Sequence, residues 1–373
     1  MKRFGNLFAR LVSWENLVRA SHAARRHKRF RNDVLRFEYF CEPELLRLQR
    51  ELDSGEYQPG TYRTFWIREP KLRLISAAPY RDRVVHHALC RIVEPIFERT
   101  FTEGSYACRL GRGTHAAVRK AHQLSKRYRF VCKADIEKFF PSIDHEVVCQ
   151  LFGRKIKDPR VMELLVKIVS SSHDQPEIVR YYPGDTLFSP HERRRGIPIG
   201  NQTSQFLANV MLNPLDHYVA ESLRVGGYVR YCDDFLIFAD DKATLHQAKA
   251  KVQTLLEGLR LSLHPHKCVV FPVNDGIPFL GYRIFPTHLR LAKDNVHRFR
   301  RRLRSMQRAY RAGRMNGDDV SRRIVSWLGH ARHAATYRLA ADLLDITAFI
   351  RQSPLPAESP PNDFGPSTSD SSH

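Results

Sequence analysis

The chain has 373 residues, of which 42% are hydrophobic and 27% charged, a composition that predicts a globular protein and excludes fibrous and disordered classes. Its 61 Lys and Arg residues against 39 Asp and Glu residues leave a formal net charge of +22, which favours a polyanionic partner. No apolar run reaches the length of a membrane span, and the seven cysteines contain no Cys-x-x-Cys pair. These features predict a reduced, cytoplasmic protein with no membrane partner.

The N-terminal part of the chain is expected to be helical up to about residue 55. Pro43 is expected to interrupt this helical segment. A mixed region that contains strands follows over residues 62–75. A further helix is predicted over residues 83–97, because apolar side chains recur there at helical spacing.

The middle of the chain alternates strands and helices. Residues 130–136 are predicted to form a buried strand, and residues 201–213 a helix that ends before Pro214. Residues 228–231 and 235–238 predict two strands joined by a tight turn. This mixed order of elements predicts an α+β domain.

The C-terminal part is predicted to be helical and basic from Pro286 to about residue 350. Most of the net positive charge lies in residues 1–36 and 291–338, as expected for a nucleic-acid-binding enzyme with basic arms. Solvated basic helix faces are the alternative explanation. The Ser- and Pro-rich end, residues 352–373, predicts a disordered tail.

Three carboxylates suggest a metal site. Asp233 and Asp234 lie between two apolar runs, where adjacent like charges need a cation unless they form an ordinary Asp-Asp turn. Asp135 ends the predicted strand 130–136. Carboxylates from separate strands can hold two divalent ions for phosphoryl transfer, and such hard oxygen ligands suit Mg²⁺. Spacing alone does not show that Asp135 and Asp233 meet.

Five motifs occur in the order found in reverse transcriptases. The segment 130–140 (FVCKADIEKFF) resembles the first catalytic motif of that family, and residues 231–234 (YCDD) resemble its Tyr-x-Asp-Asp box. Residues 196–205 (GIPIGNQTSQ) occupy the place of its third palm motif. Lys267 and residues 279–282 (FLGY) match the two motifs that follow.

The resemblance implies an α+β right-hand polymerase fold, with fingers, a palm of antiparallel sheet plus helices, and a helical thumb. The implied domains are a basic helical N-terminal extension (1–55), fingers and palm (56–285), a basic thumb (286–350) and the tail (351–373). The implied reaction is RNA-directed DNA synthesis with two Mg²⁺ ions, or Mn²⁺ in vitro. Its partners would be an RNA template, a DNA or RNA primer and dNTPs.

The third motif narrows the subfamily. Most reverse transcriptases have Gln-Gly-x-x-x-Ser-Pro there, whereas residues 199–205 read IGNQTSQ, which looks like the enzymes of diversity-generating retroelements. That resemblance implies error-prone copying at template adenines, together with a small basic accessory protein oligomer. One alternative is a related bacterial enzyme of phage defence or of a group II intron, copying a dedicated non-coding RNA. An alternative of another class is a non-catalytic RNA-binding scaffold.

The resemblance assigns roles position by position. The implied catalytic residues are Asp135, Asp233, Asp234 and Lys267, of which Lys267 would protonate the leaving pyrophosphate. The implied metal ligands are Asp135, Asp233, Asp234 and the carbonyl of Ile136. The implied nucleotide-binding residues are Lys71, Arg73, Phe140, Ile199 and Gly200. The implied template or primer contacts are Arg81, Arg83, Ser204, Gln205, Phe279, Gly281, Tyr282, Arg301 and Arg302.

Several of these assignments have simpler alternatives. Phe140 stands at the family's steric-gate position, which selects deoxynucleotides, but a Phe here is also consistent with ordinary core packing. Ile199 replaces a Gln that seats nucleotide and template, and we expect looser discrimination from this change unless the pocket is only repacked. Arg81 and Arg83 could contact the template backbone or pair with Asp82.

Overall fold

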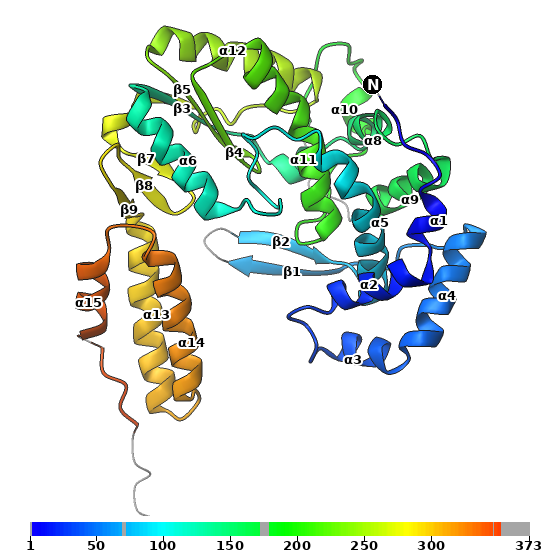
Figure 1. Ribbon diagram of the computed structural model, residues 1–373, viewed down its shortest axis with the longest axis horizontal. Helices are drawn as coiled ribbons and strands as arrows, with labels where there is room; N and C mark the ends of the chain where they lie inside the picture. The colour runs from blue at the N-terminus through cyan, green and yellow to red at the C-terminus, as the bar shows by residue number, and fades with distance from the viewer. Residues whose placement is uncertain (1, 69–71, 172–178, 346, 352–373) are drawn as a thin grey trace, which may run out of the picture. The chain divides into compact units, whose positions relative to one another are not determined.

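The computed structural model describes residues 2–68, 72–171, 179–345 and 347–351 (Figure 1). The chain divides into two compact units, Met1–His288 and Leu289–His373. The predicted tail, residues 352–373, and the nucleotide-binding candidate Lys71 lie outside the described residues. No helix in the described ranges is long and apolar enough to cross a membrane.

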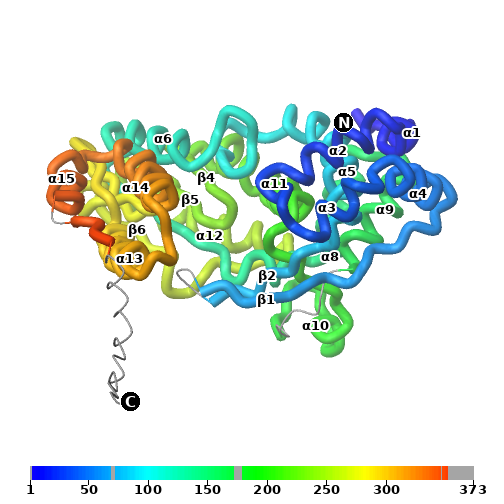
Figure 2. The backbone as a smooth tube through the Cα atoms, turned by 90° about the horizontal axis from the view of Figure 1, so that it is seen from below, coloured from blue at the N-terminus to red at the C-terminus, as the bar shows by residue number. Residues whose placement is uncertain are grey.

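The first part of the chain forms helices α1 (Phe8–Leu11), α2 (Trp14–Ala24), α3 (Asn32–Tyr39), α4 (Cys41–Ser54) and α5 (Tyr80–Glu98). Helices α1, α2 and α3 pack against α5, and α4 packs against α2 and α3 (Figure 2). Buried Leu17 and Ala20 lie on α2, in the same hydrophobic core as Val84 and Leu89 of α5. The helix expected over 83–97 is therefore confirmed.

The predicted interruption of the helical segment occurs at Phe40, between α3 and α4, three residues before Pro43. Pro43 itself is the third residue of α4. The first turn of a helix leaves its backbone N–H groups without intrahelical partners, so a proline there loses nothing. Helix α4 ends at Ser54, and the next residue, Gly55, has a φ of 78°, which suits a glycine.

Two antiparallel strands, β1 (Arg63–Arg68) and β2 (Leu72–Ala77), confirm the strand-containing region. Every residue of β1 is exposed, whereas β2 becomes buried towards Ser76. The register pairs Ile67 with Arg73 and Phe65 with Ile75, so these four side chains share one face. The pair therefore projects from the core as a strand arm.

A four-stranded antiparallel sheet forms the centre of the first unit, in the order β4-β5-β3-β6. Its strands are β3 (Phe130–Asp135), β4 (Gly227–Tyr231), β5 (Asp234–Ala239) and β6 (Val269–Pro272). Two helices pack on it, α6 (Thr114–Arg127) and α12 (Lys242–Gly258). Both strand predictions for this region are confirmed, and the two-residue connection between β4 and β5 is the expected tight turn.

Helix α11 (Gln202–His217) is buried along most of its length. The predicted stop at Pro214 is wrong, because the helix runs through this residue and continues as a π-helical turn, η1 (Tyr218–Ser222). A proline inside a helix removes one backbone hydrogen bond. Burial of Met211, Leu212 and Leu215 in the core offsets that loss, so packing overrides propensity here.

The remaining elements of the first unit are shorter. They are α7 (Phe139–Ser142), α8 (His145–Gly153), α9 (Pro159–Ser170), α10 (Ser189–Glu192), η2 (Val273–Asp275), β7 (Ile277–Phe279) and β8 (Tyr282–Ile284). Strands β7 and β8 form a hairpin in which Phe279 faces Tyr282. Both turn residues, Leu280 and Gly281, have positive φ, which is the geometry of a type I′ turn.

The second unit is helical and basic, as predicted for this part of the chain. It contains β9 (Leu289–Leu291), α13 (Lys293–Arg311), α14 (Gly317–Ala331) and α15 (Tyr337–Asp345). Its small core is formed by Phe299, Leu303, Met306 and Leu343. The Trp327 ring stacks on Phe299 with centroids 3.8 Å apart, which joins α14 to α13.

His86 makes the stability of the first unit sensitive to acid. It is 1% exposed on α5, and neither ring nitrogen has a hydrogen-bond partner among the described residues. Burial, together with the smaller effects of neighbouring His87 and Arg83, lowers the pKa of His86 from 6.5 to about 3. Below pH 6.5, His86 therefore binds a proton in the unfolded chain but not in the folded chain. As a result, the folded state loses stability as the pH decreases.

We expect His86 to remove about 1.4 kcal/mol of stability for each pH unit between 6.5 and about 4. Replacing it, as His86→Leu, should flatten this part of the pH profile of urea unfolding. The exposed His246 of α12 supplies the control, since His246→Gln should leave the profile unchanged. An unchanged slope in His86→Leu would show that other groups carry the acid sensitivity.

Candidate active site

The sheet brings the predicted carboxylates together. In the register of β3 and β5, Asp135 lies directly opposite Asp234. Tyr231 and Asp234 also pair, so Cys232 and Asp233 form a two-residue turn between β4 and β5. Cys232 has a φ of 55°, at a turn position that usually belongs to glycine. The two strands therefore present all three acids at the same end of the sheet.

Backbone hydrogen bonds join this turn to the chain that leaves β3. The N–H of Ile136 donates to the carbonyl of Asp233 at 3.3 Å. The N–H of His264 donates to the carbonyl of Asp135 at 2.8 Å, and that of Glu137 donates to Ser262 at 2.9 Å. The loop after α12 is thus held against the carboxylates, and this loop carries Lys267.

Two lysines face the carboxylates. Lys267 Nζ lies 2.8 Å from Asp135 Oδ2 in a half-buried ion pair. Lys133 Nζ lies 3.9 Å from Asp234 Oδ2. The predicted general acid therefore stands beside a predicted metal ligand, and its ammonium group offsets part of the negative charge.

The remaining negative charge is poorly compensated. Burial is the main cause that raises the pKa of Asp234 to about 7; the Asp135 and Asp233 carboxylates contribute to this rise, and Lys133 opposes it. Burial also raises the pKa of Asp233, and the Asp135 carboxylate adds to that rise. Ionised carboxylates are thus disfavoured at this site until a cation joins them.

This donor set fits a hard divalent cation. Asp234 Oδ1 is buried and has no hydrogen-bond partner in the described part of the chain, although buried polar atoms normally have one. Among the described residues, no group of three or more His, Cys, Asp or Glu side chains lies close enough together to hold a metal ion. The three Asp residues are those that would hold Mg²⁺, for which oxygen ligands are suited.

The third motif borders the strand arm. Gly200 has a φ of 113°, and a Cβ built on it would lie 3.4 Å from Ile75 Cγ2 of β2. Ile199 beside it is partly exposed. Arg73, exposed on the same strand face as Ile75, is close enough to lower the pKa of Asp233. Arg73 thus lies near Asp233, and Gly200 lies against the strand that carries Arg73.

Phe140 is the second residue of α7, a helix that begins directly after Lys138, whose φ is 44°. The ring of Phe140 is partly exposed, whereas Phe139 beside it is 2% exposed. The carbonyl of Phe140 accepts a hydrogen bond from the N–H of Ile197 at 3.0 Å. The motif containing Phe140 is therefore attached to the motif containing Ile199.

Asn201 was not singled out from the sequence. Its side chain is 5% exposed, accepts from the N–H of Ala78 at 3.5 Å and donates to the carbonyl of Ser76 at 3.4 Å. These bonds connect the start of α11 to the end of β2. An Asn directly before a predicted helix indicates a helix cap, but Asn201 makes no capping hydrogen bond and its link to β2 is a tertiary contact.

Arg81 and Arg83 have partners other than Asp82. Arg81 forms an ion pair with Glu51 and lies over the Tyr57 ring, while Asp82 accepts from the Tyr57 hydroxyl and from the N–H of Gly60. The suggested pairing of these arginines with Asp82 is therefore corrected. Arg83 Nε donates to the carbonyl of Ala78 at 2.8 Å, near the strand arm.

The candidate template and primer contacts differ in exposure. Ser204 is 2% exposed, whereas Gln205 is exposed and its Oε1 accepts from the Cys108 thiol. Phe279 and Tyr282 are each 1% exposed, so their side chains support the β7–β8 hairpin. Of the three candidates in this hairpin, only Gly281 is partly exposed, and it can offer a primer only its backbone.

Arg301 and Arg302 belong to the second unit. Both are exposed on α13, and helical spacing places Arg301 on the side opposite the buried Leu303 and Met306. Their positions suit contacts with a phosphate backbone.

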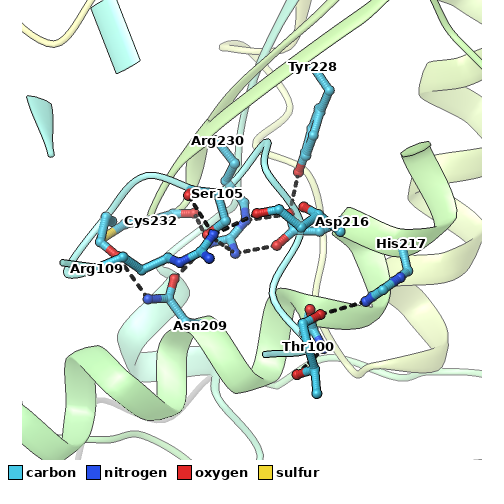
Figure 3. A network of polar contacts seen from close by, with 12 residues as sticks. Thr100, Ser105, Arg109, Asn209, Asp216, His217, Tyr228, Arg230 and Cys232 are labelled. Atoms are coloured by element: carbon cyan, nitrogen blue, oxygen red, sulfur yellow. Dashed lines mark hydrogen bonds and ion pairs between the residues drawn. The ribbon is translucent and has the colours of Figure 1, made fainter. Parts of the chain in front are cut away.

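Arg230 is a further residue that the sequence analysis missed. It is fully buried in β4 and forms an ion pair with the equally buried Asp216 (Figure 3). A charged residue three positions before Asp-Asp, in an otherwise apolar strand, was the signal available in the sequence. Figure 3 also shows that the Arg230 guanidinium reaches the carbonyl of Cys232.

The fold and this carboxylate site define a nucleotidyl-transferring polymerase of the reverse transcriptase class. Residues 67–284 match the reverse transcriptase (RNA-dependent DNA polymerase) family, and the chain belongs to that family. It is an RNA-directed DNA polymerase by class, as predicted.

Its relatives include proteins of group II introns. Protein YkfC of Escherichia coli (strain K12) is 31% identical over 293 residues, which cover 68% of this chain and 74% of that protein. The group II intron-encoded protein LtrA of Lactococcus lactis subsp. cremoris is 26% identical over 185 residues. That match covers 49% of this chain and 29% of LtrA, so this chain spans less than a third of the length of LtrA.

Proposed function

We propose that this protein copies an RNA template into DNA by two-metal nucleotidyl transfer, with Asp135, Asp233 and Asp234 as the acids that hold the ions. The observation that carries the proposal is the register that sets Asp135 opposite Asp234, next to the turn that holds Asp233. When bound, two Mg²⁺ ions would activate the primer 3′-hydroxyl and neutralise the leaving pyrophosphate.

The other residues of the site bind and orient substrate in this proposal. Arg73 on the strand arm holds the triphosphate through charge-assisted hydrogen bonds. Lys267 donates a proton to the leaving pyrophosphate, a role supported by its place 2.8 Å from Asp135. Residues 56–285 act as fingers and palm, and the basic helices of 286–350 act as the thumb.

We further propose that the template is a repeat RNA of a diversity-generating retroelement, copied with errors at adenine. The third motif, with Ile199 in place of Gln, supports this setting, in which a small basic accessory oligomer assists. A group II intron-like role is the second candidate, and the similarity to LtrA favours it.

The proposed function is tested by primer extension on an RNA template with Mg²⁺ and dNTPs, followed by sequencing of the cDNA. Extension that EDTA stops supports the polymerase, and errors concentrated opposite adenine support diversification. Accurate extension would favour the intron-like role. If the protein binds RNA but does not extend the primer, either alone or with a co-purified accessory protein, an RNA-binding scaffold would be favoured.

Ile199→Gln tests whether this residue lowers fidelity. Gln can hydrogen-bond the nucleotide or template base, and Ile cannot. Because one specific hydrogen bond discriminates by about 10-fold or more, we expect misincorporation opposite adenine to fall about 10-fold. The cDNA sequencing assay measures this directly. Ile199→Leu keeps an apolar side chain and should match the parent, and equal error rates in all three proteins would contradict the role.

A further inference from the structure

The strongest unassigned feature is the buried network around Arg230. Arg230 and Asp216 are both 0% exposed. The Arg230 guanidinium donates two hydrogen bonds to the Asp216 carboxylate, from Nε to Oδ1 at 2.6 Å and from Nη2 to Oδ2 at 2.5 Å. Such bidentate geometry fixes the plane and direction of the arginine head group.

The remaining donors of Arg230 point to three other acceptors. Nη2 donates to Ser105 Oγ at 2.9 Å, and Nη1 donates to Asn209 Oδ1 at 3.2 Å and to the carbonyl of Cys232 at 3.1 Å. A guanidinium has five N–H bonds, and each has an acceptor here. One of these five N–H groups, on Nη1, therefore donates to the β4–β5 turn, which carries Asp233 (Figure 3).

The anchor of this network is rigid. Asp216 and Asn209 stand seven residues apart on α11, and hence on one face of that helix. The main chain of Arg230 is also tied, because its N–H donates to Gly104 at 2.7 Å and its carbonyl accepts from Tyr106 at 2.9 Å. The guanidinium thus connects helix α11 to the β4–β5 turn through hydrogen bonds.

The turn needs such support. Cys232 holds a positive φ without being glycine, a conformation that persists only where the surroundings enforce it. The Arg230 bond to its carbonyl restrains the peptide between Cys232 and Asp233. A buried ion pair by itself adds little stability over apolar residues of the same size. Stability alone therefore does not account for the pair.

We propose that Arg230, held by Asp216 and Asn209, is a positioning residue that fixes the Cys232 carbonyl and thereby aims the Asp233 carboxylate at the metal ions. Arg230 touches neither metal nor substrate in this role. The inference rests on the proposed function, because it assumes that Asp233 is a metal ligand.

Arg230→Lys tests this role. A lysine has three N–H donors and can retain Asp216 but cannot also hold the remaining acceptors. Loss of a residue that orients a metal ligand lowers affinity or activity by about 10- to 100-fold. We expect Mn²⁺ binding, measured by electron paramagnetic resonance without substrate, to weaken about 10-fold, and kcat to fall by a similar factor. KM for dNTP should stay within about twofold.

Tyr228→Phe is the matched control. It removes a 2.8 Å hydrogen bond from the tyrosine hydroxyl to Asp216 Oδ1 and leaves the Arg230 bond to Cys232 in place. This variant should melt at a lower temperature yet bind Mn²⁺ and turn over like the parent. A loss of Mn²⁺ affinity equal to that of Arg230→Lys would overturn the specific role of Arg230.

If Arg230→Lys does not fold, the double variant Arg230→Met/Asp216→Leu replaces the pair by apolar residues, which proteins often tolerate. Weak Mn²⁺ binding in this folded variant supports the inference, and parental binding overturns it. If the parent and Arg230→Lys extend primers equally well, the inference about Arg230 is refuted but the proposed function is not. A parent that neither extends nor binds Mn²⁺ would refute the proposed function and the inference together.

Discussion

Replacing Asp233 by Asn is expected to lower primer extension by about 10³-fold or more. The amide keeps the size of the side chain but removes the charge that would hold the metal. Loss of one hydrogen-bond donor to a transition state costs about 10²- to 10³-fold, and a charged metal ligand should cost at least as much. Single-turnover extension with Mg²⁺ measures the loss.

The same variant should remain folded. Burial and the nearby Asp135 carboxylate raise the pKa of Asp233, so its ionised form at pH 7 favours the unfolded chain. Without metal, Asp233→Asn should therefore melt no lower than the parent. Asp240→Asn, an exposed acid that follows β5, is the matched control and should keep full activity. Parental activity in Asp233→Asn would refute the assigned metal site.

Local pattern predicted the strands of the site well. Residues 130–135 and 234–239 are nearly continuous apolar runs that end at Asp135 and begin at Asp234, and runs of this kind indicate buried strands. The effect of each proline depends on its surroundings: Pro43 lies in the first turn of α4, just after the interruption at Phe40, whereas burial of α11 keeps Pro214 inside a helix. Helix ends are set by such context, which sequence pattern does not contain.

The assembly of the site was only partly predictable. Asp135 and Asp233 are far apart in sequence, and only the resemblance joined them before the β3–β5 register was known. The partner of Arg230 is carried on α11, a different element, so no spacing rule identifies Asp216. Likewise, pairing of Arg81 with Glu51 depends on how α4 packs near α5. Long-range polar pairing is a tertiary property, and neither propensity nor periodicity encodes it.

Phe140→Ala is expected to relax the choice between deoxynucleotides and ribonucleotides. The Phe140 ring is partly exposed beside the third motif, to which its backbone carbonyl is bonded. If the ring lies under the sugar of the incoming nucleotide, Ala leaves room for a 2′-hydroxyl. Because pocket size alone discriminates by about 10- to 200-fold, we expect rNTP use relative to dNTP use to rise about 10²-fold.

The ratio of kcat/KM for dGTP and GTP on one template separates this role from core packing. A steric gate predicts that Phe140→Ala gains GTP incorporation while kcat/KM for dGTP changes little, since the new space matters only for the larger sugar. A core phenylalanine predicts a lower melting temperature and an equal loss with both nucleotides. Phe140→Tyr keeps the ring and should retain the parental selectivity. Equal losses with dGTP and GTP in Phe140→Ala would therefore assign Phe140 to the core and leave sugar selection to another residue.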